Sequence, residues 1–351
     1  RFDSYLIRYI ILSCYRFKNN LIYDMSRFVY IILFCFSSLV GQSQIDIKPF
    51  ASHNQGPLIH SFGLPNVEGG RIVEKGKFSI SSIFNLSSNS TNALTQNEIV
   101  YFDGEMDRLD FNVKYGITKH LEIGLNLPFI NHSEGFMDSS IDGFHGALGM
   151  SGGARANTPR GEMLYTYIRN DKSLINFNKS VFGIGDISFE LGFKLLDNKA
   201  YSMALRTYLK LNNADKRKLL GSGTTDFSFQ FSGQTSGLGP RPAYFFYSLG
   251  YLRVGKGSLL EDMQNRNITF ASMGLAVKAT SWLAPKMQFD YHSKFYKNSM
   301  TQELGDYGLQ FLLGADFIIN EKLILTGGFS EDIKINTSPD FVLHLALNYS
   351  F

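Results

Sequence analysis

From about residue 77 onward, apolar and polar residues alternate along most of the chain. The most regular run is the last one, in which apolar residues occupy every second position: Phe341, Leu343, Leu345, Leu347, Tyr349 and Phe351. A period of two residues is typical of a β-strand with one apolar and one polar face. Because this period recurs in segment after segment, the sequence predicts an all-β fold.

Twelve segments carry this alternation, at 78–87, 109–115, 121–127, 187–195, 201–211, 224–232, 243–253, 268–279, 282–292, 306–318, 321–331 and 340–351. Short links are expected at 118, 197–199, 280–281 and 319–320, and long ones at 88–107, 129–183, 212–223, 254–267, 293–305 and 332–339. Alternation of short periplasmic turns with long external loops is typical of a transmembrane β-barrel. We therefore predict a single antiparallel barrel of about twelve strands. Two weaker runs at 164–168 and 174–177 would make fourteen, but we interpret them as a hairpin projecting from the external loop.

The N-terminal part has a different character. Met25 is followed by a basic residue, an apolar run over 28–40 and the small residues Gly41 and Ser43, which is the pattern of a secretory signal peptide. We expect 1–24 to be an upstream extension foreign to the protein, 25–43 to be a cleaved signal peptide, and the product to reside in a Gram-negative outer membrane. The alternative is a membrane anchor made from the apolar runs 5–15 and 28–40. Both cysteines, Cys14 and Cys35, would be removed with the signal, which excludes disulfides and cysteine-bound metals from the mature chain.

Residues 44–75 are rich in proline and glycine, including Pro49, Pro57, Pro65 and the pair Gly69 and Gly70. A central strand does not tolerate such a density of residues that interrupt hydrogen bonding. We therefore expect 44–75 to form a tail or a plug, and 76–351 to form the barrel.

Composition agrees with a barrel in lipid. The chain has 31 Phe, 18 Tyr, one Trp and 33 Gly, residues that a barrel uses for lipid contact, interfacial girdles and tight turns. The net charge of +3 is too small to indicate a nucleic-acid partner. The expected partners are outer-membrane lipid and the barrel-assembly machinery, which would recognise the last strand ending in Phe351. No cofactor is expected, and the oligomeric state stays open.

Several short pieces follow one another along the chain: Asn54-Gln55-Gly56-Pro57-Leu58, Phe62-Gly63-Leu64-Pro65, Asp103-Gly104-Glu105, Tyr115-Gly116, Leu127-Pro128, the stretch 132–145 and Gly183-Ile184-Gly185-Asp186. Taken in this order, they resemble an uncharacterised family of bacterial outer-membrane β-barrels, domain of unknown function 3187. The resemblance implies an outer-membrane barrel and carries no activity.

Two groups of residues are candidates for function. Charged residues of both signs fall on the predicted inner face: Asp110, Lys114, Glu122, Glu190, Lys194, Arg206, Lys210, Asp290 and Asp316. They would line an aqueous pore or pair with one another across a blocked one.

The second group is expected at the external mouth and consists of Asp103, Glu105, His132, Asp138, Asp142, His145 and Arg155. Two imidazoles with several carboxylates could bind a divalent cation or carry out acid and base chemistry on a lipid headgroup. A solvated polar loop is the alternative, because no His-Glu-x-x-His spacing is present.

Three functions follow from these candidates. The first is a channel or uptake barrel for a small or lipidic solute, with 44–75 folded inside. The second is an outer-membrane lipid hydrolase with its site at the mouth, and the third is a structural or adhesive surface barrel. The first is favoured, and an enzyme is the less favoured interpretation.

Overall fold

The structure is a computed structural model that describes residues 46–137, 161–198, 200–235, 237, 242–334 and 337–351. The chain divides into two compact units, 1–43 and 44–351, and all described residues belong to the second. No helix among these described residues is long and apolar enough to cross a membrane.

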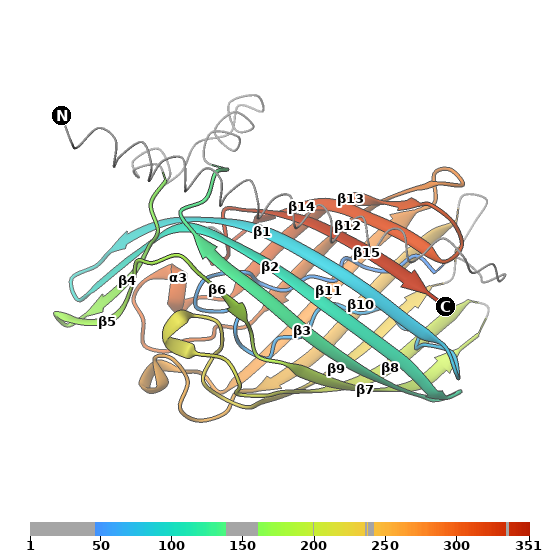
Figure 1. Cartoon of the computed structure of the whole chain (residues 1–351), viewed down its shortest axis with the longest axis horizontal. Coiled ribbons are helices and arrows are strands. Elements are labelled where there is room, and N and C mark those ends of the chain that lie inside the picture. Colours follow the sequence, from blue (N-terminus) through green and yellow to red (C-terminus); the bar gives the residue numbers. More distant parts are fainter. Residues whose placement is uncertain (1–45, 138–160, 199, 236, 238–241, 335–336) are drawn as a thin grey trace, which may run out of the picture. The chain divides into compact units, whose positions relative to one another are not determined.

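Twelve antiparallel strands close into a barrel, because the first strand pairs with the last (Figure 1). The wall strands are β1 (Phe78–Leu94), β2 (Glu98–Thr118), β3 (Leu121–Ser133), β7 (Ser188–Asp197), β8 (Tyr201–Lys210), β9 (Asp226–Thr235), β10 (Ala243–Arg253), β11 (Asn267–Val277), β12 (Leu283–His292), β13 (Gly308–Ile318), β14 (Leu323–Asp332) and β15 (Phe341–Ser350). Each pairs with its neighbour in the chain, and β3 pairs with β7. The predicted all-β barrel and its strand number are confirmed.

Three further strands lie outside the closed wall. β4 (Leu164–Arg169) pairs with β2, β5 (Lys172–Phe177) pairs with β4, and β6 (Val181–Ile184) pairs with the end of β3. The predicted projecting hairpin is therefore present as β4 and β5. Within the described residues, the helical pieces are one turn each: η2 (Lys216–Lys218), η3 (Glu261–Met263) and α3 (Gln302–Gly305).

The first external loop differs from the prediction. Residues 88–107 are not a loop, because β1 and β2 continue through them and only 95–97 link the two strands. β3 likewise runs to Ser133, beyond its predicted end. The extended parts stay in strand form because β4 and β6 pair with them and an apolar core covers their inner face. We call residues 90–103 together with β4 and β5 the lid.

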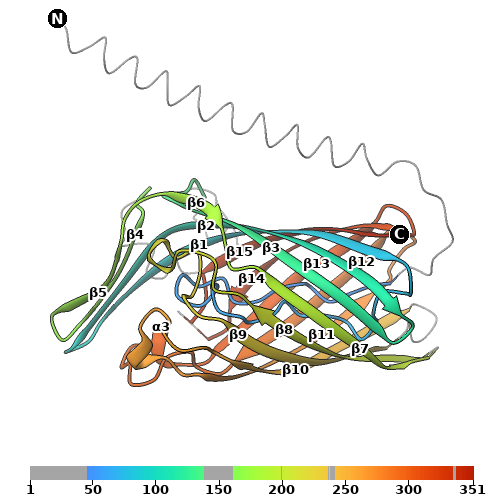
Figure 2. The same ribbon diagram turned by 60° about the horizontal axis from the view of Figure 1, so that its bottom comes forward.

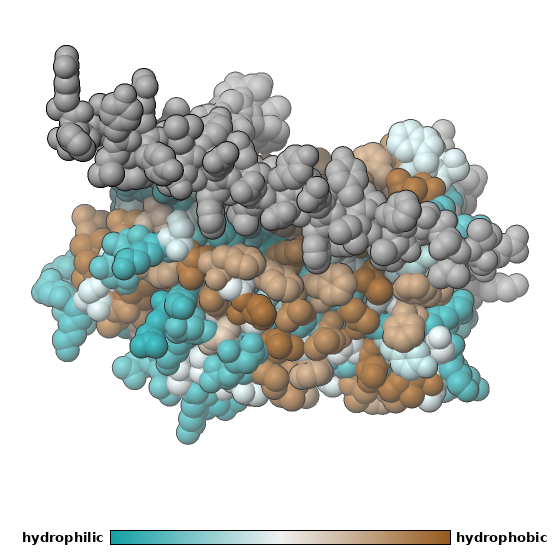
Figure 3. Space-filling view, in the orientation of Figure 1, coloured by the Kyte–Doolittle hydropathy of each residue, from teal (hydrophilic) through white to brown (hydrophobic). Residues whose placement is uncertain are grey.

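The two faces of the wall have opposite character. Side chains that point outward form an apolar band around the barrel, seen as brown atoms on the side shown in Figure 3. It includes Leu125, Phe193, Phe229, Leu249 and Met273, all at least 40% exposed. The alternate positions are polar and buried inside the barrel. A barrel surrounded by lipid requires apolar side chains on its outer face and allows polar ones on its inner face.

Residues 46–75 lie inside the barrel, where Figures 1 and 2 show them as a blue trace enclosed by the wall. We call this segment the plug. Ile47 packs against Ala276, Ala284 and Ile318 near the short turns, the region around Leu58 reaches the opposite end, and Lys75 pairs with Gly116 back near the turns. The plug therefore enters and leaves at one end, which is the periplasmic end of an outer-membrane barrel.

Candidate functional site: the plugged lumen

The rising limb of the plug follows β12. The backbone N–H of Phe50 donates to the amide oxygen of Gln288 at 2.9 Å, and the Gln288 amide nitrogen donates back to the Phe50 carbonyl at 3.1 Å. Ser52 donates to Asp290 at 2.5 Å. This limb belongs to no strand and makes only a few backbone hydrogen bonds, such as that from Val67 to the Ser52 carbonyl, so the side chains of the wall satisfy several of its polar groups, as burial requires.

The returning limb follows β9 and β8. The N–H of Gly63 donates to Asp226 at 2.9 Å, and that of Gly70 donates to Gln234 at 3.1 Å. Arg206 on β8 donates to the carbonyls of Gly69 at 2.7 Å and Arg71 at 2.6 Å. One arginine thus holds two carbonyls, two residues apart, of the descending chain.

The tip of the plug is apolar and is covered by the lid. Leu58, Ile59, Phe62 and Leu64 join a buried cluster with lid residues such as Val100, Phe102, Tyr165 and Tyr167 and with residues of the external loops such as Met263, Phe295 and Leu304. The Phe62 and Phe295 rings stack at 5.2 Å between centroids. Apolar packing of the plug tip, lid and loops therefore closes the external end of the lumen.

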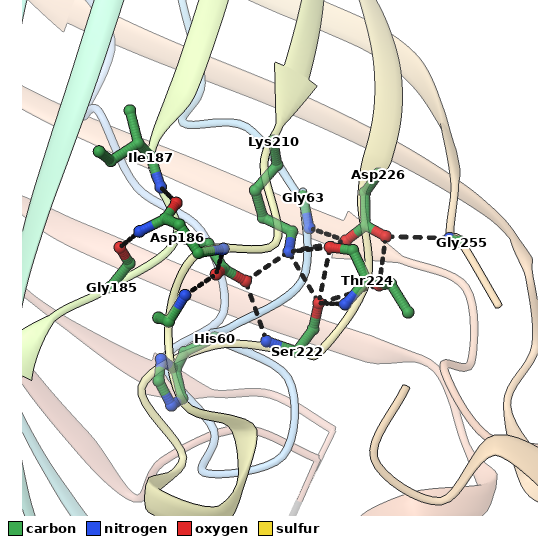
Figure 4. A network of polar contacts seen from close by, with 12 residues as sticks. His60, Gly63, Gly185, Asp186, Ile187, Lys210, Ser222, Thr224, Asp226 and Gly255 are labelled. Atoms are coloured by element: carbon green, nitrogen blue, oxygen red, sulfur yellow. Dashed lines mark hydrogen bonds and ion pairs between the residues drawn. The ribbon is translucent and has the colours of Figure 1, made fainter. Parts of the chain in front are cut away.

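Below this core, a polar network joins the plug to three parts of the wall (Figure 4). The ammonium of Lys210 lies 2.6 Å from Asp186 and 3.3 Å from Asp226, and it donates to Ser222 at 2.7 Å. Asp226 in turn accepts from Gly63 of the plug and from the N–H of Gly255. The network fixes the plug against the loops that follow β8 and β10.

The charged residues predicted on the inner face lie there and are neutralised in pairs. The pairs are Asp110 with Arg108 at 2.8 Å, Lys114 with Glu190 at 2.9 Å and with Glu68 at 2.7 Å, Arg206 with Glu122 at 2.9 Å, Lys194 with Asp197 at 3.0 Å, Lys210 with Asp186, and Lys286 with Asp316 at 2.7 Å. Asp290 accepts hydrogen bonds from Ser52 and Gln288. Of the two alternatives for these charges, pairing beside a filled lumen is the one the geometry supports, although the partners are near neighbours on the wall or on the plug.

A small cavity remains between the plug and strands β2, β3, β7 and β8. It measures about 60 Å³ and is lined by His60, Asn126, Glu190 and Tyr208, among others. A water molecule needs about 10 to 15 Å³ of such space, so this cavity accommodates only a few. Between these described residues, the cavity is therefore too small to form a wide aqueous path.

The mouth cluster does not assemble from its described members. Asp103 and Glu105 lie on the outer face of β2, where Glu105 accepts from the N–H of Met137, itself packed against Leu86 on the outside of the barrel. His132 points inward, so the wall separates it from both carboxylates. The expectation that these three meet fails because alternation along β2 and β3 puts them on opposite faces. Asp138, Asp142, His145 and Arg155 lie outside the described residues.

The contacts of His132 are those of a buried residue that supports the fold. Its Nε2 lies 3.2 Å from the carbonyl of Leu219, which accepts, so we place the ring proton on Nε2. Its ring packs edge-on against His60 of the plug, and burial holds the pKa of His60 well below its usual range. In the part of the chain that the structure describes, no group of three histidine, cysteine, aspartate or glutamate side chains has the geometry to hold a metal.

The sequence reasoning missed the uncharged partners of the plug. It selected charged inward residues and passed over Gln230, Ser232, Gln234 and Gln288, all of which are at most 1% exposed. The signal was available in β9, where every second residue from 226 to 234 is polar. A row of this kind inside a barrel indicates a buried polar contact, because a lumen-facing amide has to find a partner.

Comparisons with known proteins agree with this architecture. The model of the family described as "Protein of unknown function (DUF3187)" matches residues 27–351. The COG4313 outer membrane channel from Pseudomonas putida F1 is similar in structure, with a TM-score of 0.53 and 14% identity over 80% of this chain and 98% of that one. The toluene transporter TbuX from Ralstonia pickettii has a TM-score of 0.39 and 11% identity over 85% of this chain and 98% of that one.

No curated protein matches the sequence. At these identities the solved structures bear on the fold alone, which is that of an outer-membrane β-barrel. The family model, in contrast, spans both the plug and the complete barrel. The chain therefore belongs to the DUF3187 family, and its fold is a plugged outer-membrane β-barrel.

Proposed function

We propose that the protein is a gated outer-membrane channel for a small or lipidic solute, with the plug as its gate. The observation that carries the proposal is the path of the plug, which enters the lumen, reaches the lid and leaves again at the same end. A segment arranged in this way can withdraw toward the periplasm without unthreading from the wall.

The contacts of the plug suit reversible movement. Its limbs are held by hydrogen bonds and ion pairs, which water replaces as the segment leaves. Its clustered apolar packing lies at the tip and near Ile47, while Phe50, Val67 and Ile72 are buried singly along the limbs. Along the limbs, withdrawal therefore exposes isolated apolar side chains and not a continuous apolar core.

Single-channel recording of the full-length protein tests the proposal. The double variant Gln288→Ala with Gln234→Ala removes one anchor from each limb and should raise the open probability about tenfold or more, because each lost contact is worth about 1 kcal/mol. Swelling of liposomes in solutions of small sugars should rise in parallel.

The matched control is Met287→Ala, which changes the lipid-facing neighbour of Gln288 and leaves the plug contacts intact. It should behave like the wild type in both assays. If all three proteins show the same conductance and swelling, the plug is not a gate and the proposal is wrong.

A further inference from the structure

Two rows of polar side chains hold the plug, one on each side of the lumen. The β12 row consists of Lys286, Gln288, Asp290 and His292, which contact plug residues 48, 50, 52 and 54 in that order. Every contact joins residues 238 positions apart, so the plug runs parallel to β12 in steps of two residues. The β12 row therefore matches an extended chain, with one contact for every two residues.

The β9 row holds the returning limb with a less even spacing. Asp226, Gln230, Ser232 and Gln234 face inward and contact, in that order, Gly63, Asn66, Gly69 and Gly70, so the wall and the plug again advance in the same direction. The spacing of inward side chains on a strand is about 6.8 Å, which is also the two-residue repeat of an extended peptide, and the β12 row matches this repeat at every contact.

Most of these bonds are made to the backbone of the plug. Gln288 binds both the N–H and the carbonyl of Phe50, Gln234 accepts from the N–H of Gly70, and Arg206 donates to two carbonyls. Glu122 accepts from the N–H of Val73 at 2.7 Å. Any extended polypeptide presents these groups, whatever its side chains.

The wall also carries hydrogen-bonding atoms that the plug does not use. Among the described residues, Ser228 Oγ and Gln230 Oε1 on β9 and Ser248 Oγ on β10 are buried and have no hydrogen-bond partner. Buried polar atoms are usually paired. This surface can therefore accept more peptide groups than the plug supplies.

We propose that the lumen is a binding site for extended peptides, which compete with the plug for the β12 and β9 rows. Alternating backbone donors and acceptors distinguish this ligand class from acyl chains, which offer neither, and from glycans, which lack the two-residue repeat of amides. Peptides are then the solute class of the channel; that step rests on the proposed gate, whereas binding itself does not.

A cut plug provides the test. Gly76 is exposed, has a φ of 77°, and has open space around it, so a protease site inserted there should be tolerated and accessible. The full-length protein is folded, reconstituted and then cleaved, which leaves the plug held only by non-covalent contacts. A dye placed before residue 46 reports its release.

Four competitors are then added. They are a synthetic peptide of residues 46–75, a peptide with the same composition in scrambled order, the scrambled peptide N-methylated at positions 50, 63, 70 and 73, and a linear maltooligosaccharide of similar length. These four positions correspond to the plug N–H groups that donate to wall side chains. The first two should displace the plug at concentrations within about tenfold of each other. Methylation should weaken the scrambled peptide about fivefold per lost bond, and the sugar should not compete.

Three results would overturn the proposal: failure of the native segment to exchange, failure of the scrambled peptide when the native one succeeds, or equal competition by the methylated peptide or the sugar. Conductance after release is read separately. A barrel that loses its plug to peptides and yet does not conduct would refute the gated channel while leaving peptide binding intact.

Discussion

Arg206 is the residue on which the returning limb depends most. It is 1% exposed, pairs with Glu122 and with Glu190 at 3.1 Å, and holds the carbonyls of Gly69 and Arg71. Arg206→Leu leaves Glu122 buried without its ion-pair partner, a change that costs about 3 to 5 kcal/mol, whereas Glu190 keeps Lys114 at 2.9 Å. We expect the variant to assemble as a barrel with a loosened limb, seen as a higher open probability and faster proteolysis within 66–75.

A substitution at the neighbouring position, Leu205, is expected to impair assembly and not the seating of the plug. Leu205 points to the lipid side of β8, where an arginine at mid-depth costs about 2 to 4 kcal/mol. Leu205→Arg should therefore lower the yield of folded barrel, measured as the heat-modifiable band on a gel, without opening the folded fraction. Equal tolerance of the two substitutions in both assays would contradict the register of β8.

His53 makes the seating of the plug depend on pH. Its Nδ1 donates to Asn66 at 2.6 Å and its Nε2 accepts from Gln55, so only the neutral ring fits. Burial, and then the charge of Arg108, lower its pKa from 6.5 to about 4, against the opposing effects of Asp110 and the Asn66 bond. In a released plug, His53 has its ordinary pKa and is protonated at a higher pH than in the seated plug.

Acid should therefore favour release, by about tenfold per pH unit from His53 between pH 6.5 and 4, with His60 acting in the same direction. Open probability recorded from pH 7 to 4.5 checks the sign. His53→Gln should remove about one proton from the slope. A wild-type channel that closes in acid, or an unchanged slope in the variant, would count against this account.

At the scale of the element, the lid is fastened through Glu98. Its carboxylate accepts from Tyr167 at 3.0 Å, from Ser299 at 2.8 Å and from the N–H of Met300 at 2.8 Å. Glu98→Gln would turn an amide N–H toward a donor and leave one of these groups unpaired, at a cost of about 1 to 3 kcal/mol. Hydrogen exchange over 164–177 should then be about five to a hundred times faster, with the barrel strands unaffected.

Tyr101→Phe is the matched control, since it removes a hydrogen bond to Asp103 at 3.2 Å on the outer face of the same strand. It should leave exchange in the lid unchanged. Lid exchange that responds equally to both substitutions would show that Glu98 is not the fastening point.

The elements also show what local pattern can and cannot predict. Wall strands in lipid were predictable, because their outward positions must be apolar whatever the rest of the chain does. The lid parts of β1 and β2 were not, because the run Ser87-Ser88-Asn89-Ser90-Thr91 has no apolar face and reads as a loop. What keeps these β1 residues in a strand is pairing with β2, whose own end is held by pairing with β4 and by packing against loops far along the sequence.

At the scale of the molecule, the sequence indicated that 44–75 could not be wall but left its position open, as a tail or a plug. Its path depends on contacts such as Phe50 with Gln288 and Gly63 with Asp226, more than 160 residues apart and made through plug backbone. Every sequence has the same backbone groups, so no pattern of residues in the plug predicts these contacts. The inward charges were predicted, with pairing as one of two alternatives, whereas the identity of each partner depends on which wall strands lie side by side.

A reversible tether between plug and wall tests the gate most directly. The side-chain oxygens of Ser52 and Asp290 are 2.5 Å apart, so Ser52→Cys with Asp290→Cys should form a disulfide after a small adjustment. Ser272→Cys with Asp290→Cys is the control, since these residues face each other across β11 and β12 and tie wall to wall. Single-channel openings of the first variant should disappear on oxidation and return on reduction, while the control conducts in both states. Openings that persist in the oxidised plug-tethered protein would contradict the account.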